Sequence, residues 1–223
     1  MTVFDQYHHL LKHIRDHAVQ CGREPDEITL IGVTKNHPWE HVHPAYQAGC
    51  RDFGENKVQE ALSKMEEAAD DLRWHLIGTL QKNKVRKVIG KFALIHSVDS
   101  VDLAKKLSEC SVEAGVTTAI LLEVNSSGEA SKHGFSLDEV EEAYQRVKMF
   151  PNLDVQGLMT MAPFTKDEHV IRSCFRSLRE LRDAYGFKHL SMGMSNDYPI
   201  AIEEGATLLR IGTQIFGVRE LAM

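Results

Sequence analysis

Short apolar runs alternate with amphipathic segments along the whole chain, and this alternation most constrains the fold. The first run, 28–33, is compact and rich in β-branched residues, which is typical of a parallel strand buried on both faces. Further strands are expected at 52–54, 72–78, 92–98, 117–124, 153–159, 189–192 and 207–211. Helices are expected at 4–20, 39–48, 57–69, 81–88, 101–113, 137–148, 166–185 and 197–204, followed by a last short helix.

About eight strand–helix repeats without a break in composition predict one α/β domain, a (β/α)8 TIM barrel that covers residues 1–223. The competing architecture is a doubly wound parallel sheet, which would need a glycine-rich first turn to bind a dinucleotide. The segment 32–36 reads Gly-Val-Thr-Lys-Asn and offers no such turn. The barrel is therefore the preferred prediction.

Two local signals refine the expected helices. Pro44 lies inside 39–48, so we expect the regular part of that helix to begin there. Ser136 precedes the helix 137–148 and Glu139 follows three residues later, which predicts a capping box at its start.

Charge and histidine spacing exclude two kinds of binding site. The net charge is −6 and no long basic run is present, so no nucleic-acid surface is expected. The basic cluster 82–87 is interpreted as the solvated face of a helix. His37 and His41 have helical spacing, but Pro38 lies between them and no HExxH pattern is present, so no metal site is expected.

Cysteine use and hydropathy indicate the compartment. The four cysteines lie far apart without a CxxC pair, which matches free thiols in a reducing compartment rather than a disulfide framework. No apolar run reaches transmembrane length, and residues 1–5 lack a signal pattern. We therefore expect a soluble, cytoplasmic protein that does not bind a membrane.

A lysine, Lys35, stands at the carboxyl end of the first strand. In a barrel of parallel strands, the residues that do chemistry lie at that end. An amine held against an apolar strand is desolvated, which favours its neutral form and lets it attack an aldehyde. The alternative is that Lys35 only begins the solvated loop 36–38.

Polar residues near the other strand ends would share one rim with this lysine if the barrel is correct. That rim is expected to contain Lys35, Glu55, Asn56, His75, Gly78, Asp99, Glu123, Asn125, residues 159–162, Met194, Ser195, Arg210, Gly212 and Thr213.

The segments 193–197 and 210–213 follow the seventh and eighth strands and combine glycines with small hydroxyl residues. Amide N–H groups and hydroxyls at a helix start bind anionic oxygens, and barrels commonly bind phosphate after these two strands. The alternative is that Gly193, Ser195 and Gly212 are ordinary turn and cap residues. Two such loops side by side favour a phosphate site.

Arg210 ends an apolar strand, so its guanidinium needs a partner. Either it forms a structural salt bridge, to Glu203 or Glu204, or it donates to a ligand atom away from the phosphate. Arginine stays protonated, so a pyridine nitrogen facing it would stay unprotonated. An amine, a phosphate site and a cationic donor on one rim suit pyridoxal 5'-phosphate (PLP), whose aldehyde forms an imine with lysine.

A set of motifs then makes a family recognisable. They lie at 33–35, 53–56, 58–60, 74–78, 80–84, 96–99, 157–159, 193–197 and 210–217. In this order, over nearly the whole chain, they closely resemble the pyridoxal phosphate homeostasis protein family. Members of that family are single-domain PLP-binding barrels related to the N-terminal domain of alanine racemase.

The resemblance implies a cofactor site with a role for each residue. Lys35 would hold PLP as an internal aldimine, and Arg210 would face its pyridine nitrogen. Ser195, Gly212 and Thr213 would hold the phosphate. Asn56 and Met194 would line the pocket. The resemblance assigns no catalytic residue.

Two segments depart from the family pattern. The family often has Ser-Lys-Ser-Gly after the fifth strand, whereas this chain has Ser-Lys-His-Gly, in which Lys132 and Gly134 fit and His133 departs. Asn196 stands where the family often has aspartate, while Asp197 matches. The phosphate turn therefore remains expected, with altered electrostatics.

The resemblance implies a PLP carrier or buffer in intracellular vitamin B6 homeostasis rather than an enzyme. Racemisation in this fold needs a base on each face of the cofactor, and Lys35 serves one face. The chain ends at Met223, so we expect it to lack the second domain that supplies the opposite tyrosine in alanine racemase. The alternatives are a weak racemase-like enzyme and a barrel that binds another phosphate. The resemblance implies a monomer, and PLP-requiring apoenzymes are the expected recipients.

Overall fold

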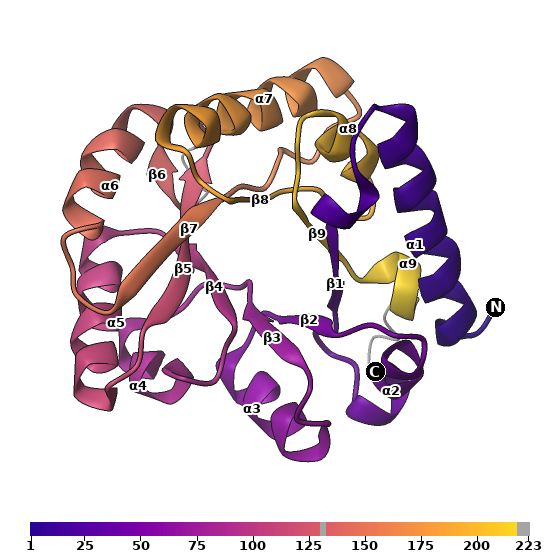
Figure 1. Ribbon diagram of the computed structural model, residues 1–223, viewed down its shortest axis with the longest axis horizontal. Helices are drawn as coiled ribbons and strands as arrows, with labels where there is room; N and C mark the ends of the chain where they lie inside the picture. Colours follow the sequence, from indigo (N-terminus) through magenta and orange to yellow (C-terminus); the bar gives the residue numbers. More distant parts are fainter. Residues whose placement is uncertain (130–132, 218–223) are drawn as a thin grey trace.

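The computed structural model describes residues 1–129 and 133–217, in which parallel strands close into a ring (Figure 1). The order around the ring is β4-β3-β2-β1-β9-β8-β7-β5, and pairing of β4 with β5 closes it. The predicted (β/α)8 barrel is confirmed. The strands are β1 (Thr29–Val33), β2 (Asp52–Glu55), β3 (Arg73–Leu76), β4 (Leu94–Val98), β5 (Thr118–Asn125), β6 (Phe135–Ser136), β7 (Leu153–Met159), β8 (His189–Ser191) and β9 (Leu208–Ile211).

Helices cover the outside of the ring in chain order (Figure 1). The helix before the first strand packs against α2, α8 and α9. Because α9 has only 4 residues, this first helix covers the side of the barrel that a longer last helix would cover. The helices are α1 (Val3–Gln20), α2 (Trp39–Gln47), α3 (Val58–Glu67), α4 (Val85–Val88), α5 (Val101–Ala114), α6 (Val140–Val147), α7 (Glu168–Tyr185), α8 (Tyr198–Glu203) and α9 (Thr213–Phe216), with 3-10 turns η1 (Pro25–Glu27), η2 (Lys82–Lys84) and η3 (Leu137–Glu139).

Three helices differ from the sequence prediction. The helix α2 begins at Trp39 and continues through Pro44, rather than beginning there. Proline removes one helical hydrogen bond, but Trp39, Val42 and Ala45 are buried and hold the inward face of α2 against the core. The helix predicted at 81–88 is divided into η2 and α4, and the helix predicted at 137–148 is divided into η3 and α6.

The short strand β6 was not predicted, because two residues carry no periodic signal. It pairs with the end of β5 outside the ring. The capping box that follows it is confirmed: the Ser136 N–H donates to Glu139 Oε2 at 2.8 Å.

The inside of the barrel has an apolar cluster of its own. Its buried members are Ile31, Leu94, Leu121, Met159 and Leu208, from five different strands. Their neighbours on the same strands belong to the larger cluster between the strands and the helices, because successive side chains of a strand point to opposite faces. The middle of the barrel is therefore packed with side chains.

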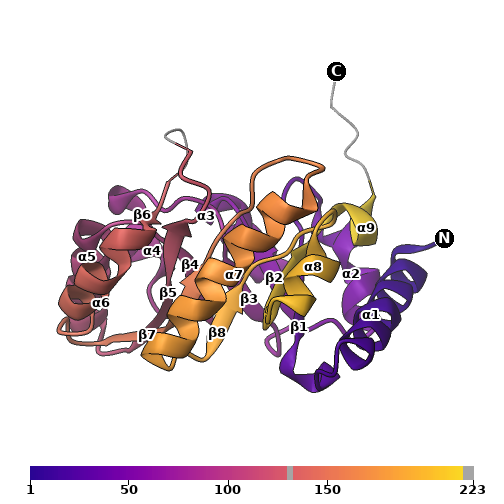
Figure 2. The same ribbon diagram turned by 90° about the horizontal axis from the view of Figure 1, so that it is seen from above.

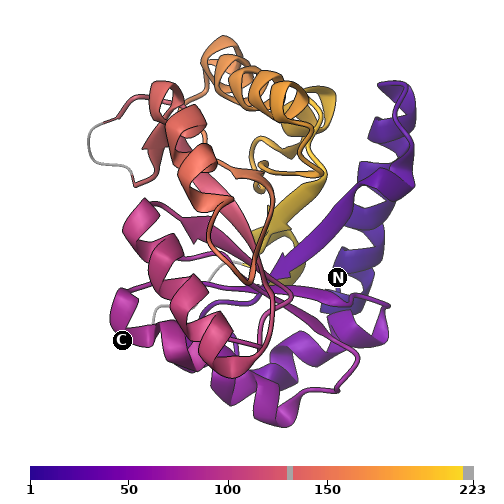
Figure 3. The same ribbon diagram turned by 60° about the vertical axis from the view of Figure 1, so that its left-hand side comes forward.

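The loops at the carboxyl ends of the strands lie on one side of the ring. Figure 2 shows the loop before α7 on the same side as α9 and β6. On the outer wall α7 lies beside α8 (Figure 3). The buried Glu204 carboxylate at the end of α8 pairs with Arg172 at 3.2 Å, Arg176 at 3.0 Å and Arg179 at 2.8 Å, all on α7. These ion pairs fix α8 and the loop 193–197 that leads into it.

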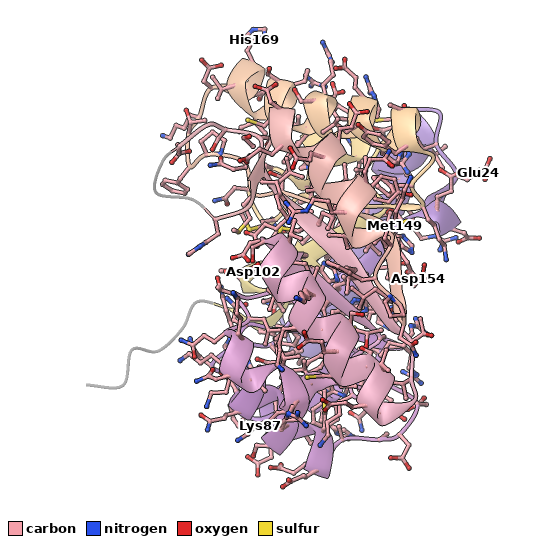
Figure 4. All side chains as sticks on the ribbon, turned by 90° about the vertical axis from the view of Figure 1, so that its left-hand side faces the viewer. Glu24, Lys87, Asp102, Met149, Asp154 and His169 are labelled. Carbon is pink, nitrogen blue, oxygen red and sulfur yellow. The ribbon has the colours of Figure 1, made fainter. Side chains whose placement is uncertain are left out.

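The basic cluster 82–87 lies on the outer surface, as expected. Figure 4 shows Lys87 and Asp102 on the outside of the barrel. Lys82 pairs with Asp102 at 3.0 Å. In the parts of the chain that the structure describes, no helix is long and apolar enough to span a bilayer.

Two strand glycines provide a matched test of the packing between strands. A Cβ on Gly157 of β7 would lie 2.0 Å from the His189 carbonyl oxygen of β8, whereas a Cβ on Gly32 of β1 would meet its nearest atoms at 3.4 Å. We expect Gly157→Ala to lower the free energy of unfolding by about 3 kcal/mol, because β7 and β8 must separate. Gly32→Ala should change it by less than about 1 kcal/mol. Urea denaturation measures both, and equal effects would contradict the close contact at Gly157.

Candidate functional site

A cavity of about 330 Å³ opens at the carboxyl ends of the strands. Its wall comes from the ends of β1, β2 and β9 and from the loops after β7 and β8. This volume lies in the range of small-molecule sites, about 300–1,000 Å³. The residues that the sequence assigned to a cofactor all line it: Lys35, Asn56, Met194, Ser195, Arg210, Gly212 and Thr213.

The backbone that precedes Lys35 is held by a buried ion pair. Lys64 of α3 donates to the Thr34 carbonyl oxygen at 2.6 Å and pairs with Glu55, whose side chain is fully buried. The Thr34 hydroxyl also donates to Glu55. Burial raises the pKa of Glu55, while the bonds from Lys64 and Thr34 act in the opposite direction.

The backbone that follows Lys35 is held by the same cluster. Asn36 adopts the left-handed conformation, with φ of 64°, which is uncommon for residues other than glycine. Its N–H donates to Glu60 Oε1, which also accepts from Lys64 Nζ at 3.0 Å. One charged cluster on α3 and β2 therefore fixes the chain on both sides of the cavity lysine.

Arg210 is 5% exposed and is held by neutral acceptors. Its guanidinium donates to the Ser191 hydroxyl and, at 2.8 Å, to the Thr160 carbonyl oxygen. The alternative expectation of a salt bridge to Glu203 or Glu204 is wrong, because both carboxylates pair with arginines of α7 on the outer wall. Arg210 instead lines the cavity.

The charge of Arg210 persists despite its burial. Burial lowers the pKa of Arg210 to about 10, and the carboxylates of Asp197 and Glu123 act against this change. The guanidinium therefore stays protonated at neutral pH and presents a positive charge to any group in the cavity.

The two glycine and hydroxyl loops are tied to each other and to β1. The Asp197 carboxylate accepts from the Met194 N–H at 2.6 Å, and Gln214 Nε2 donates to the Ser195 carbonyl oxygen at 2.6 Å. The second bond joins the loop after β8 to the start of α9. A Cβ on Gly212 would lie 2.9 Å from a carbonyl oxygen of β1. These contacts bring the hydroxyl residues of both loops to one wall.

Asn56 lines the cavity, and its side chain has an unmet hydrogen bond. Its Oδ1 is buried and has no partner among the described residues. The backbone at Gly78 lies close to the backbone at Asn56, because Gly78 has no side chain. A Cβ on Gly78 would lie 2.4 Å from the Asn56 carbonyl oxygen. A donor on a bound ligand would satisfy Oδ1.

Part of the expected rim does not reach the cavity. Glu55 points outward to α3, and His75 binds Asp52 and His96 inside the barrel. The physical reason is that alternate side chains of a strand face opposite sides and that barrel strands are staggered. The expected rim residues that are not part of the cavity wall are Glu55, His75, Gly78, Asp99, Glu123, Asn125, Met159 and Thr160.

Other cavity residues were not assigned to the site from the sequence. The loop after β7 contributes 161–165, of which only the first two positions were expected, and Phe164 is fully exposed at the opening. His37 and Asp197 also line the wall. A loop without periodicity gives no signal for such residues. Lys132 lies outside the described residues, and His133 Nδ1 lies 3.8 Å from Asp99 Oδ2.

Among residues 1–129 and 133–217, His17, Cys21 and Glu203 offer possible metal ligands within 4.8 Å of one another. Arg172 pairs with Glu203, which places a competing cation there. The group joins α1 to the end of α8 and does not line the cavity.

The fold and the cavity together define the class of protein: an alanine racemase-type barrel with a lysine after its first strand. The family model "Alanine racemase, N-terminal domain" matches residues 8–220. Alanine racemase of Clostridium difficile 630 superposes with a TM-score of 0.72 over 92% of this chain and 55% of its own, at 15% identity. That similarity concerns the fold alone.

Full-length relatives are more specific. The pyridoxal phosphate homeostasis protein of Aquifex aeolicus is 40% identical over 227 residues, 99% of this chain and 100% of the relative. The pyridoxal phosphate homeostasis protein of Pseudomonas aeruginosa is 41% identical over 222 residues, which cover 98% of this chain and 96% of the relative. The chain belongs to the pyridoxal phosphate homeostasis protein family. The structure of PipY from Synechococcus elongatus with PLP bound is 37% identical, with a TM-score of 0.79 over 92% of this chain and 100% of PipY.

The substitution Lys64→Met tests the ion-pair cluster around Lys35. It leaves Glu55 buried without its cation, so we expect the free energy of unfolding to fall by about 3–5 kcal/mol. A matched control is Lys12→Met, which breaks an exposed pair with Asp16 and should cost less than about 1 kcal/mol. Urea denaturation distinguishes the two, and an equally small effect at both positions would show that the buried pair does not stabilise the fold.

Glu123 gives the stability a pH dependence of known sign. Its Oε2 is buried without a partner among the described residues, and burial, with a contribution from Asp99, raises its pKa to about 7. The folded state therefore binds this proton more tightly, and stability is lost as pH rises from about 4.5 to about 7. Glu123→Gln mimics the neutral acid, so it should match wild type within about 1 kcal/mol at pH 5 and exceed it by up to about 3 kcal/mol at pH 8.5. Urea denaturation at the two pH values provides the measurement, and a pH-independent difference would contradict the assignment.

Proposed function

We propose that this protein binds PLP covalently through Lys35 and acts as a carrier or buffer in PLP homeostasis. The observation that carries the proposal is one cavity with an amine, a buried guanidinium and two hydroxyl-bearing loops on its wall. The similarity to PipY, whose structure has PLP bound, supports the same ligand here. Relatives that are 40% and 41% identical are named for PLP homeostasis.

The residues present fit each polar end of PLP. The Lys35 amine would condense with the aldehyde, forming a C=N bond while the aldehyde oxygen leaves as water. Ser195 and Thr213, with the backbone at Gly212, would donate to the phosphate oxygens. Arg210 would donate to the ring nitrogen and keep it unprotonated.

The remaining walls also fit this ligand. Asn56 Oδ1 is buried without a partner among the described residues, so a bound ligand that donates there would remove the cost of leaving it unpaired. Met194 adds a flexible apolar surface beside it. A Cβ at Gly212 would collide with β1, so the glycine lets the backbone after β9 lie close to β1 at the cavity wall.

We propose storage and transfer rather than turnover. Racemisation would require a second base opposite the lysine. No tyrosine is found among the described residues that line the cavity, and its titratable side chains besides Lys35 and Arg210 are His37 and Asp197. The Asp197 carboxylate is already used as an acceptor for the Met194 N–H.

The proposal extends to location and partners. Cys50, Cys110 and Cys174 are buried free thiols, which suits the reducing cytoplasm. The opening of the cavity at the exposed Phe164 leaves a route by which PLP can leave for PLP-requiring apoenzymes. We propose that the protein works there as a monomer.

The substitution Lys35→Ala tests the covalent link. We expect the wild-type protein with PLP to show a visible imine band, which borohydride reduction and mass mapping place on Lys35. Lys35→Ala should lose the band entirely and keep its unfolding midpoint, because a cavity-wall side chain contributes little to the core.

The control is Lys82→Ala, which changes an exposed lysine outside the cavity and should retain the band. A band that survives in Lys35→Ala would show that another residue holds PLP. A wild-type protein that stays colourless with added PLP would overturn the cofactor assignment and leave a barrel that binds another phosphate.

A further inference from the structure

A chain of buried side chains crosses the inside of the barrel and ends at Arg210. Asp52 Oδ1 lies 3.0 Å from His75 Nε2, His75 Nδ1 lies 3.0 Å from His96 Nε2, and His96 Nδ1 lies 2.8 Å from the Ser191 hydroxyl. The same hydroxyl accepts from Arg210. All five side chains belong to residues no more than 6% exposed, and they come from β2, β3, β4, β8 and β9.

With both imidazoles neutral, the two ends of this chain determine where every proton lies. An ionised carboxylate only accepts, so His75 donates to Asp52 from Nε2 and accepts at Nδ1. His96 must then donate from Nε2 and accept at Nδ1, where the Ser191 hydroxyl donates. The serine oxygen is left to accept from Arg210, which can only donate. Every hydrogen bond therefore runs in one direction, from the arginine to the aspartate.

The protonation of the chain is consistent with this direction. Burial, with the charge of Arg210 acting in the same direction, places the pKa of His96 well below its ordinary value, so the ring is neutral. The hydrogen bonds from His75 and Arg73 lower the pKa of Asp52, against the effect of its burial. Arg73 binds Asp52 at the amino end of the barrel, with its Nε 2.8 Å from Oδ1.

The chain leaves the charge of Arg210 available to the cavity. Its acceptors among the described residues, the Ser191 hydroxyl and the Thr160 carbonyl oxygen, are neutral. Among the described residues no carboxylate lies within 4.0 Å of the guanidinium. Asp52, the carboxylate that terminates the chain, is separated from it by two imidazoles and a hydroxyl.

We propose that Ser191, His96 and His75 are positioning residues for the ligand: they hold Arg210 in a single orientation in which it donates to the ring nitrogen of PLP. This inference rests on the proposed function. The chain orients the guanidinium through a neutral oxygen, so no carboxylate at hydrogen-bond distance competes with the ligand for its charge.

The test combines a measurement without ligand and one with PLP. In the ¹⁵N spectrum of the imidazoles, recorded without added PLP at pH 7.5, His75 and His96 should both be neutral with the proton on Nε2. Ser191→Ala removes the side-chain acceptor of Arg210 and leaves only the Thr160 carbonyl oxygen, so the dissociation constant for PLP should rise on the order of tenfold and the visible band should change its absorbance maximum. Ser191→Thr retains the hydroxyl and should restore both.

Ser111→Ala is the matched control. Ser111 is also a fully buried serine, but it lies on α5 outside the barrel, where its hydroxyl donates to a backbone carbonyl oxygen. It should leave affinity and spectrum unchanged. If Ser191→Ala does not fold, His75→Gln interrupts the same chain three hydrogen bonds from Arg210 and should also weaken PLP binding and move the band.

Two results would overturn the inference and leave the proposed function unaffected. These are a protonated or Nδ1–H imidazole at His75 or His96, and a wild-type band and affinity in a folded Ser191→Ala. A wild-type protein that forms no band would instead overturn the proposed function, and the role of the chain toward PLP with it.

Discussion

The hydrogen bonds between β4 and β5 close the sheet into a ring, and the other features of the molecule depend on this closure. A closed sheet has no exposed edge, and its parallel strands all direct their carboxyl ends to one face. Residues as distant in sequence as Lys35 and Thr213 therefore meet in a single cavity. The first helix α1 completes the outer layer where α9 is short.

Burying charge inside such a barrel requires partners for each group. The structure has two separate solutions. On the outer side of β2, Lys64 joins Glu55 and Glu60 and holds the backbone around Lys35. Inside the barrel, Arg210 is held through neutral groups. The first arrangement fixes the backbone on both sides of Lys35, and the second leaves a positive charge facing the cavity.

The sequence brought several residues of the cavity wall into view for a specific reason. Lys35 and Arg210 lie at or just beyond the ends of apolar strands, so locating the strands located both residues. The same reasoning failed for Glu55, because it specified which end of the strand the residue occupies but not which face. Phe164 was missed because its loop has no hydrophobic periodicity from which its position could be predicted. The path of α2 through Pro44 also differed, because buried contacts outweighed the local preference of proline.

By itself the sequence determined the succession of strands and helices and the lysine at the end of the first strand, because apolar periodicity is a property of neighbouring residues. Only the tertiary structure decided which polar side chains meet inside the barrel. Asp52, His75, His96 and Ser191 lie on four different strands, and their contacts depend on the stagger between strands and on the face that each side chain occupies. No local pattern specifies that stagger, because it arises only when the ring closes.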